Sequence, residues 1–153
     1  NPVSDAIAEV RAGYPYPELL DETEDTIIAW QLQYPESQVG GLLLDIGCGA
    51  MDKTLVFQKL GYECFAFDDF GDPWHSDDKN LAPVLDHASA SGIKVHREIN
   101  RFEIPWQFES FDIVTIVNVI EHVHDSPRDL LNFAGRCLKP GGILLVGMPN
   151  SVN

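Results

Sequence analysis

The sequence predicts an α/β protein in which helices cover both faces of a doubly wound, mostly parallel sheet. From residue 41 onward, short apolar and β-branched runs alternate with stretches whose apolar residues recur at helical spacing. The chain has 153 residues, of which 44% are hydrophobic, and this suffices for one buried core. Because no apolar run approaches the roughly 18 residues that a membrane-spanning helix needs, we expect no membrane span.

The first 40 residues follow a different pattern. Ile27 and Trp30 stand at helical spacing within an acidic and polar segment. Just before them, residues 14–17 alternate tyrosine with proline and cannot be helical throughout. We therefore expect residues 1–40 to form a cap or lid of one or two helices over the sheet, and residues 41–153 to form the core domain.

The first strand is predicted for residues 42–45 and the first helix of the core for residues 51–60. The turn between them contains two glycines, which end the strand abruptly. Gly61 then stands where the carboxyl end of a helix favours a residue that tolerates positive φ. The second strand is predicted for residues 62–67.

A crossover helix and a short third strand follow. The apolar face of this helix has the spacing i, i+3, i+4, i+7 and comprises Leu81, Val84, Leu85 and Ala88. Gly92 follows the helix, and the third strand is predicted for residues 93–95.

The fourth strand, residues 111–117, is almost entirely apolar, so we expect it to be central and buried on both faces. Ser126 as amino cap and Pro127 at the first helical position predict the start of a helix. We expect its core face to comprise Leu131, Ala134 and Leu138. Residues 139–142 then end the helix, and the fifth strand is predicted for residues 143–146.

Charge and cysteine content exclude several classes of partner. The formal net charge is −14 and there is no basic run, so we expect no nucleic-acid partner. The three cysteines are too few and too scattered for a disulfide framework, which favours a cytoplasmic protein. The chain begins with Asn rather than Met, and we expect its ends to be trimmed.

The turn after the first strand is the feature that indicates a ligand. Gly47 and Gly49 sit between a predicted strand and a predicted helix, and Asp68 ends the next strand. Such a turn lets the backbone approach a ligand closely, and an acid at the second strand's tip can accept both hydroxyls of a ribose. The sequence therefore predicts a nucleoside pocket at this edge of the sheet.

Two acidic residues argue against a dinucleotide in that pocket. A dinucleotide site has a third glycine where this chain has Asp52, and an acid there repels the pyrophosphate. Asp45, which we expect within the turn, would repel it too. Carboxylates in a partly dry pocket instead favour a ligand that carries positive charge.

Four segments together resemble the class I S-adenosylmethionine-dependent methyltransferases, and most closely their small-molecule and glycan-associated branch. The segments stand in the family's order and spacing, and they are LLLDIGCGA at 42–50, GYECFAFDD at 61–69, FESFDIVTIVNVIEHVHD at 108–125 and LKPGGILLVGMPN at 138–150. The resemblance implies a Rossmann-like fold, S-adenosylmethionine as cofactor and methyl transfer as the reaction.

The same resemblance implies roles for residues at the methionine end of the cofactor. Gly47, Cys48 and Gly49 would line the methionine moiety, and Asp45 would lie near its ammonium group, through water or backbone. Asn118, after the fourth strand, would approach the same end. We expect Cys48 to be a small packing residue rather than a nucleophile, because no histidine is adjacent in the motif.

For the adenosyl end, the resemblance implies a second set. Asp68 would accept the ribose hydroxyls, and Asp69 or Phe70 would lie beside the adenine. Asn100, followed by Arg101, aligns with the position where relatives commonly carry an aspartate that bonds the adenine amino group, and an amide oxygen can accept that bond.

His122 is the candidate general base for a hydroxyl acceptor, with His124 second, because both follow the fourth strand where the crevice of such a sheet lies. The alternative, in which this loop histidine has only a structural role, stays open. Two histidines at i and i+2 with no further cluster make a poor metal cage, so we predict no metal.

Two departures from the family pattern matter. Met51 stands where relatives often have a third glycine, and the chain stops before the final helix and antiparallel hairpin of the usual sheet. The fifth strand would then be an exposed edge, which indicates missing residues, an oligomeric partner chain or a truncated domain.

The leading hypothesis is an S-adenosylmethionine-dependent methyltransferase that acts on a small-molecule or sugar-like acceptor. The alternative is a non-catalytic cofactor-binding or scaffold module that acts with a partner chain. A nicotinamide enzyme of the same fold is the third possibility, and the two acids near the turn disfavour it.

Overall fold

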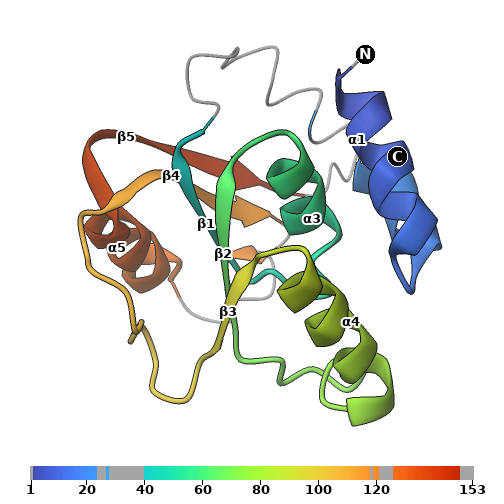
Figure 1. The fold of residues 1–153 in the computed structure, drawn as a ribbon. Coiled ribbons are helices and arrows are strands. Elements are labelled where there is room, and N and C mark those ends of the chain that lie inside the picture. The colour runs from blue at the N-terminus through green and yellow to red at the C-terminus, as the bar shows by residue number, and fades with distance from the viewer. Residues whose placement is uncertain (1, 24–26, 28–39, 118, 121–125, 149–153) are drawn as a thin grey trace, which may run out of the picture.

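In the computed structural model, five parallel strands form one sheet in the order β3-β2-β1-β4-β5 (Figure 1). The structure describes residues 2–23, 27, 40–117, 119–120 and 126–148. The strands are β1 (Leu42–Ile46), β2 (Glu63–Asp68), β3 (Lys94–Arg97), β4 (Phe111–Val117) and β5 (Leu138–Gly147). The strand order reverses between β1 and β4, which is where open α/β sheets form ligand crevices. The predicted fold class is confirmed.

Helices cover both faces of this sheet, with α3 and α4 on one side and α5 on the other (Figure 1). Their bounds are α1 (Pro2–Gly13), the 3-10 helix η1 (Pro17–Glu22), α3 (Asp52–Lys59), α4 (Asp78–Ala90) and α5 (Arg128–Cys137). The predicted crossover helices therefore lie where the sequence pattern placed them, within a few residues at each end.

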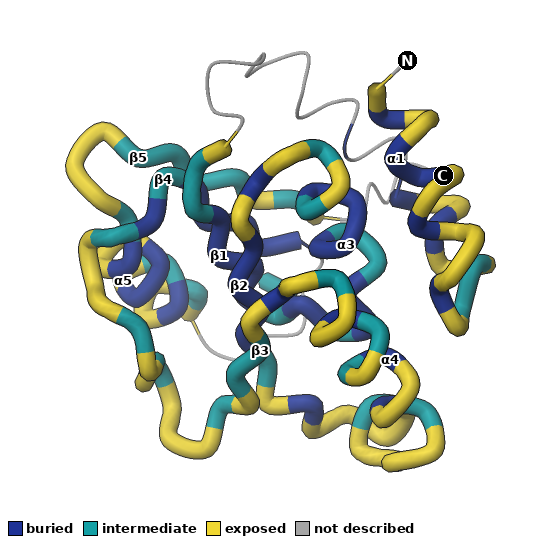
Figure 2. The backbone as a smooth tube through the Cα atoms, in the orientation of Figure 1, coloured by how far each residue is buried: buried dark blue, intermediate teal, exposed yellow. Residues whose placement is uncertain are grey.

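Two apolar clusters, one on each face of the sheet, form the core. Successive residues of a strand point to opposite faces, so Leu43 packs in the cluster with α3 and α4 while Leu44 packs in the cluster with α5. Ile113 and Val114 of β4 divide in the same way. Figure 2 shows the result, with buried residues concentrated in the strands and exposed residues in the outer loops. The prediction of a central fourth strand is confirmed.

The predicted core face of α5 was wrong by one residue. The residues that are buried are Leu130, Phe133, Ala134 and Cys137, whereas the predicted Leu131 and Leu138 are partly exposed. Both sets have helical spacing, but only the buried set includes Phe133, and an aromatic ring buries more apolar area than any other residue of this helix. The helix starts one residue later than predicted, because Pro127 is the amino cap and Arg128 the first helical residue. The Ser126 hydroxyl accepts a hydrogen bond from the Arg128 N–H at 3.3 Å.

The fifth strand begins five residues earlier than predicted. Leu138 pairs with Phe111, and the register then shifts so that Ile143 pairs with Ile113. The residues between them form an irregularity that glycine permits. At Gly142, a Cβ would lie 2.9 Å from the carbonyl oxygen of Lys139 and 3.1 Å from that of Phe111.

The amino-terminal helix α1 packs against α3 and η1, and α3 in turn covers the sheet (Figure 1). Val3, Ile7 and Val10 of α1 are buried in the same apolar cluster as α3. Ile27 is fully buried, and Trp30 lies outside the described residues. The structure describes α1 and η1 in this segment, and the helical spacing on which the prediction rested runs into residues outside the described part of the chain. None of the helices in the described part of the chain has the length and apolar character needed to cross a bilayer.

Candidate functional site

The turn between β1 and α3 has the conformation that the two glycines predict. Gly47 and Gly49 have φ of +72° and +53°, in the left-handed region that favours glycine. The Gly47 N–H donates to the carbonyl oxygen of Phe67 at 2.7 Å, which ties the turn to the end of β2. A Cβ on Gly47 would lie 2.3 Å from Cγ2 of Val119. Glycine therefore allows the segment after β4 to approach the turn closely.

Asp68 ends β2, as predicted, and the backbone holds its carboxylate at the sheet edge. Oδ2 accepts a hydrogen bond from the Gly49 N–H and Oδ1 accepts one from the Phe70 N–H, each at 2.8 Å. Burial raises the pKa of Asp68, although these two bonds oppose the shift. A carboxylate has about four lone-pair sites, so both oxygens can accept further bonds from a ligand.

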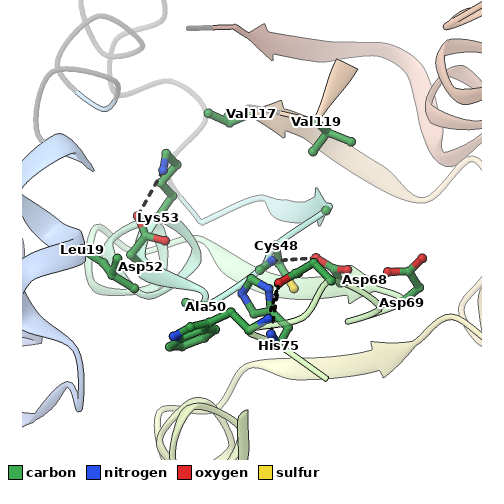
Figure 3. A pocket seen from close by; sticks show the side chains of 14 residues that line it. Leu19, Cys48, Ala50, Asp52, Lys53, Asp68, Asp69, His75, Val117 and Val119 are labelled. Atoms are coloured by element: carbon green, nitrogen blue, oxygen red, sulfur yellow. Dashed lines mark hydrogen bonds and ion pairs between the residues drawn. The ribbon is translucent and has the colours of Figure 1, made fainter. Parts of the chain in front are cut away.

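A cavity of about 780 Å³ opens beside this carboxylate (Figure 3). Four parts of the chain line it: the glycine turn with the start of α3, the loop after β2, the residues at the end of β4, and Leu19 from η1. Its volume lies within the range of roughly 300–1,000 Å³ that small-molecule sites occupy. Trp74, in the loop after β2, lies on the wall and packs edge-on against the Tyr16 ring at 5.0 Å.

A second cavity of about 220 Å³ lies between the ends of β2 and β3 and the start of α5. Glu98, Arg101 and Phe102 line it. The residues that line both cavities are Gly47, Asp68, Asp69 and Val119. The two cavities therefore adjoin at the carboxylate that ends β2, and together they suit an elongated ligand with two parts.

The larger cavity is acidic, with one cation among its described lining residues. Four aspartates line it, and Lys53 contributes the single positive charge. The Lys53 ammonium group pairs with Oδ2 of Asp52 at 3.1 Å, and the Thr23 hydroxyl donates to the same oxygen at 2.7 Å. The start of α3 is thus tied to the amino-terminal segment at the cavity wall.

Asp45 lies inside β1, as the predicted strand over residues 42–45 has it, and not in the turn that faces the ligand. It is 4% exposed and lines neither cavity. Its two oxygens accept hydrogen bonds from the hydroxyls of Thr54 and Thr115 at 2.6 and 2.8 Å. Burial raises the pKa of Asp45 to about 6, against the effect of both hydroxyls.

Three other predicted residues surround the turn. Cys48 lines the larger cavity, and burial raises the pKa of its thiol well above the ordinary value, which suits packing rather than nucleophilic attack. Asp69 lines both cavities. Phe70 is buried and lines neither, and its backbone N–H holds Asp68.

The prediction for the segment after β3 needs a correction. Asn100 lines neither cavity, and its exposed side chain donates to Oε2 of Glu103 at 3.0 Å. Besides Asp68 and Asp69, the second cavity is lined by Glu98, an acid that sequence reasoning missed, and by the predicted Arg101. The predicted third strand ended at Val95, whereas β3 continues to Arg97, so the first residue after the strand was not recognised.

The loop after β2 supplies a second missed pair, Asp72 and His75, which line the larger cavity. Asn118, His122 and His124, the other predicted site residues, lie outside the described residues. Within the part of the chain that the structure describes, no group of three histidine, cysteine or acidic residues could hold a metal ion.

The chain matches known families over most of its length. The profile of a family described as a methyltransferase domain matches residues 22–152. The ubiquinone biosynthesis O-methyltransferase of Rhodopseudomonas palustris (strain BisB5) is 36% identical over 111 residues, which are 71% of this chain and 40% of that protein. The enzyme of the same name from Caulobacter vibrioides is 33% identical over 113 residues, 72% of this chain and 42% of its own. The chain thus spans about two fifths of these relatives.

Solved structures share the fold at lower identity. A structure from Methanococcus maripaludis, described as an S-adenosylmethionine-dependent methyltransferase, has a TM-score of 0.61 at 20% identity, over 79% of this chain and 53% of that one. Phosphoethanolamine N-methyltransferase 2 of Haemonchus contortus, solved with S-adenosylhomocysteine, has a TM-score of 0.62 at 23% identity, over 81% and 28%. These similarities show a common fold.

Proposed function

We propose, from the premise that this chain belongs to the methyltransferase domain family, that it binds S-adenosylmethionine and transfers its methyl group to a small-molecule acceptor. The observation that carries the proposal is the position of Asp68. Its carboxylate stands where two cavities adjoin, next to a glycine turn that leaves the backbone open to a ligand.

The described residues fit an adenosyl cofactor. The two cavities offer space on either side of Asp68, and its carboxylate keeps lone pairs for the ribose hydroxyls between them. Gly47 and Gly49 line the larger cavity with backbone atoms, and Val119 and His75 lie where a Cβ on each would point. His75 lines the same cavity, and its Nε2 is buried without a hydrogen-bond partner among the described residues.

We assign the larger cavity to the methionine end and the smaller cavity to the adenine. Acidic side chains suit the ammonium and sulfonium charges, and Lys53 offers a partner to the carboxylate of the methionine moiety. In the smaller cavity, Glu98 and Asp69 are the acceptors for the adenine amino group. Burial raises the pKa of Glu98, with the opposing bond from the Phe102 N–H only partly offsetting it.

The amino-terminal segment serves as the cap that closes the larger cavity. Leu19 lies on the cavity wall, and the Thr23 hydroxyl donates to Asp52 at the start of α3. The Tyr14 hydroxyl donates to the carbonyl oxygen of Ala50 in the turn. These contacts support a division into a cap, residues 1–40, and a cofactor-binding core, residues 41–153.

When bound, the cofactor supplies a methyl group activated by a positively charged sulfur. The chain's contribution is to hold this group in one orientation and to exclude water, and well-oriented reactants gain roughly 7–11 kcal/mol from proximity. Asp68 fixes the ribose, and the cap narrows access from solvent. His122 remains the proposed general base, with His124 second.

The relatives named as O-methyltransferases support a hydroxyl oxygen of a small molecule as acceptor. Cys48, Cys64 and Cys137 are free and buried, which supports a reducing compartment such as the cytoplasm. An oligomeric partner along β5 remains a prediction from the strand order.

Calorimetry with S-adenosylmethionine and S-adenosylhomocysteine tests the proposal. We expect both to bind, and we expect labelled methyl groups to appear on at least one member of a panel of phenols and sugars. Absence of heat with either ligand would overturn the proposal. Binding of both without any methylated product would favour the non-catalytic binding module.

A further inference from the structure

The loop after β2 contains a histidine–aspartate pair with its own scaffold. Oδ1 of Asp72 accepts hydrogen bonds from the backbone N–H groups of Trp74 and His75, at 3.0 and 3.1 Å. Its other oxygen accepts from Nδ1 of the His75 ring. Burial raises the pKa of Asp72, but the bonds from His75 and the backbone outweigh it and lower the pKa overall. The Asp72 carboxylate is therefore held in place as a hydrogen-bond acceptor, and it orients the His75 ring.

The other ring nitrogen of His75 is buried and has no hydrogen-bond partner among the described residues. Because Nδ1 carries the proton shared with Asp72, Nε2 of the neutral ring is an acceptor. A buried acceptor without a partner destabilises the fold, so such a group in a native protein needs an explanation. A bound ligand that donates a hydrogen bond to Nε2 would supply the missing partner.

The surroundings of the ring set its position. It packs edge-on against Trp74 with ring centroids 4.8 Å apart, and against Phe70 at 6.2 Å. On the side of the glycine turn, a Cβ on Gly49 would lie 3.3 Å from Nε2. Nε2 of His75 therefore lies close to the backbone of the turn, and a side chain at residue 49 would crowd it.

His75 and Asp68 line the same cavity beside this turn (Figure 3). The Gly49 N–H donates to Oδ2 of Asp68, so the carboxylate and Nε2 of His75 both border Gly49. Two acceptors thus stand side by side where the proposed function places a ribose with two hydroxyl donors.

We propose that His75 is a cofactor-binding residue whose Nε2 accepts a hydrogen bond from one ribose hydroxyl while Asp68 accepts from the other, and that Asp72 positions it. The inference rests on the proposed function and deepens it, because it names a second determinant of ribose recognition. A site built around a hydroxyl rejects an analogue that lacks it, since the buried acceptor is then left unpaired.

Two substitutions of His75 separate the two ring nitrogens. His75→Asn keeps an amide near the position of Nδ1, where it can donate to Asp72, but removes the acceptor at Nε2. His75→Gln places an amide oxygen near Nε2. Calorimetry with S-adenosylhomocysteine should show about tenfold weaker binding for His75→Asn, equivalent to about 1.4 kcal/mol, and less than a threefold change for His75→Gln. Thermal unfolding checks that each variant folds.

The 2′-deoxy and 3′-deoxy analogues of S-adenosylhomocysteine identify the contact. One of them should bind the wild-type chain about tenfold more weakly and lose nothing further in His75→Asn. Equal losses for both analogues and the parent compound in His75→Asn, or no loss at all, would overturn the proposal. If His75→Asn does not fold, Asp72→Asn takes its place, because an amide at residue 72 reverses the ring tautomer and turns Nε2 into a donor.

5′-Methylthioadenosine has the ribose but lacks the amino-acid end. His75→Asn should weaken its binding by the same factor as that of S-adenosylhomocysteine. If only S-adenosylhomocysteine is affected, Nε2 contacts the ammonium group and the ribose assignment is wrong. If the wild-type chain binds none of these compounds, the proposed function itself fails.

Discussion

Two aspartates on neighbouring strands, Asp45 in β1 and Asp68 at the end of β2, carry the same chemistry in opposite surroundings. Both oxygens of Asp45 accept from side-chain hydroxyls inside the core. Those of Asp68 accept from backbone N–H groups at the sheet edge, beside the cavities. Asp45 stands one residue before the end of β1, and Asp68 is the last residue of β2. The position of an aspartate relative to the end of its strand therefore decides whether its carboxylate is enclosed in the core or borders a cavity.

The largest expected effect concerns the buried member of this pair. The pKa of Asp45 is raised from 3.8 to about 6, so the folded protein holds this proton more tightly than the unfolded chain does. The stabilising contribution of the protonated form is fully present below about pH 3.8 and is lost as the pH rises through about 6. Asp45→Asn removes this dependence.

Urea unfolding of the wild-type chain and Asp45→Asn at a series of pH values measures it. The free energy of unfolding of the wild type, relative to the variant, should fall by about 2.4 kcal/mol between pH 4 and pH 7. S-Adenosylhomocysteine binding at pH 7 should stay within threefold, because Asp45 lines neither cavity. A flat difference across this range would contradict the desolvated environment assigned to Asp45.

The second effect concerns Asp68, the half-buried member at the sheet edge. Asp68→Ala should weaken S-adenosylhomocysteine binding about 50-fold, ~2.3 kcal/mol, since bonds to a charged acceptor contribute about 1.5–3 kcal/mol. Asp69→Ala is the matched comparison, because it removes the same charge from the same two cavities while Glu98 remains as an acceptor for the adenine amino group. Calorimetry should show a loss several times smaller for the control. Equal losses would mean that general charge, rather than a ribose contact, sets the affinity.

A third effect concerns Gly47, in the turn that follows β1 and borders Asp68. Gly47→Ala should lower the free energy of unfolding by about 2 kcal/mol, from positive φ and from the clash of the new Cβ with Val119. Gly40 also has positive φ, at +92°, but nothing lies within 4 Å of an added Cβ. Gly40→Ala should therefore cost only about 1 kcal/mol in the same denaturant titration. Similar costs would show that Val119 moves aside freely.

The smallest effect compares two candidates for the contact with the adenine amino group: Glu98, which lines the smaller cavity, and Asn100, which the sequence suggested. Glu98→Gln should weaken S-adenosylhomocysteine binding about fivefold, ~1 kcal/mol, because an amide replaces one acceptor oxygen with a donor. Asn100→Ala should leave the affinity unchanged, since Asn100 lines neither cavity. The opposite ranking in calorimetry would restore the assignment made from the sequence.

Local signals in the sequence were sufficient for the existence and order of the five described strands, the turn and the position of Asp68, but not for the bounds of β3 and β5. Alternating apolar runs define which residues a parallel sheet buries, and the positive φ values at Gly47 and Gly49 follow from a sharp strand-to-helix turn. The same signals failed at α5, where two sets of residues had helical spacing and burial of Phe133 selected between them.

The sequence by itself determined the order of the strands along the chain, the glycine turn and the acid at the end of β2, because each depends on neighbouring residues. Only the tertiary structure decided which carboxylates meet a cavity. Asp45 is enclosed because Thr54 and Thr115 come from α3 and β4, and His75 faces the turn because Asp72 orients its ring. Such contacts depend on how several elements pack together, and no local pattern in the sequence predicts that packing.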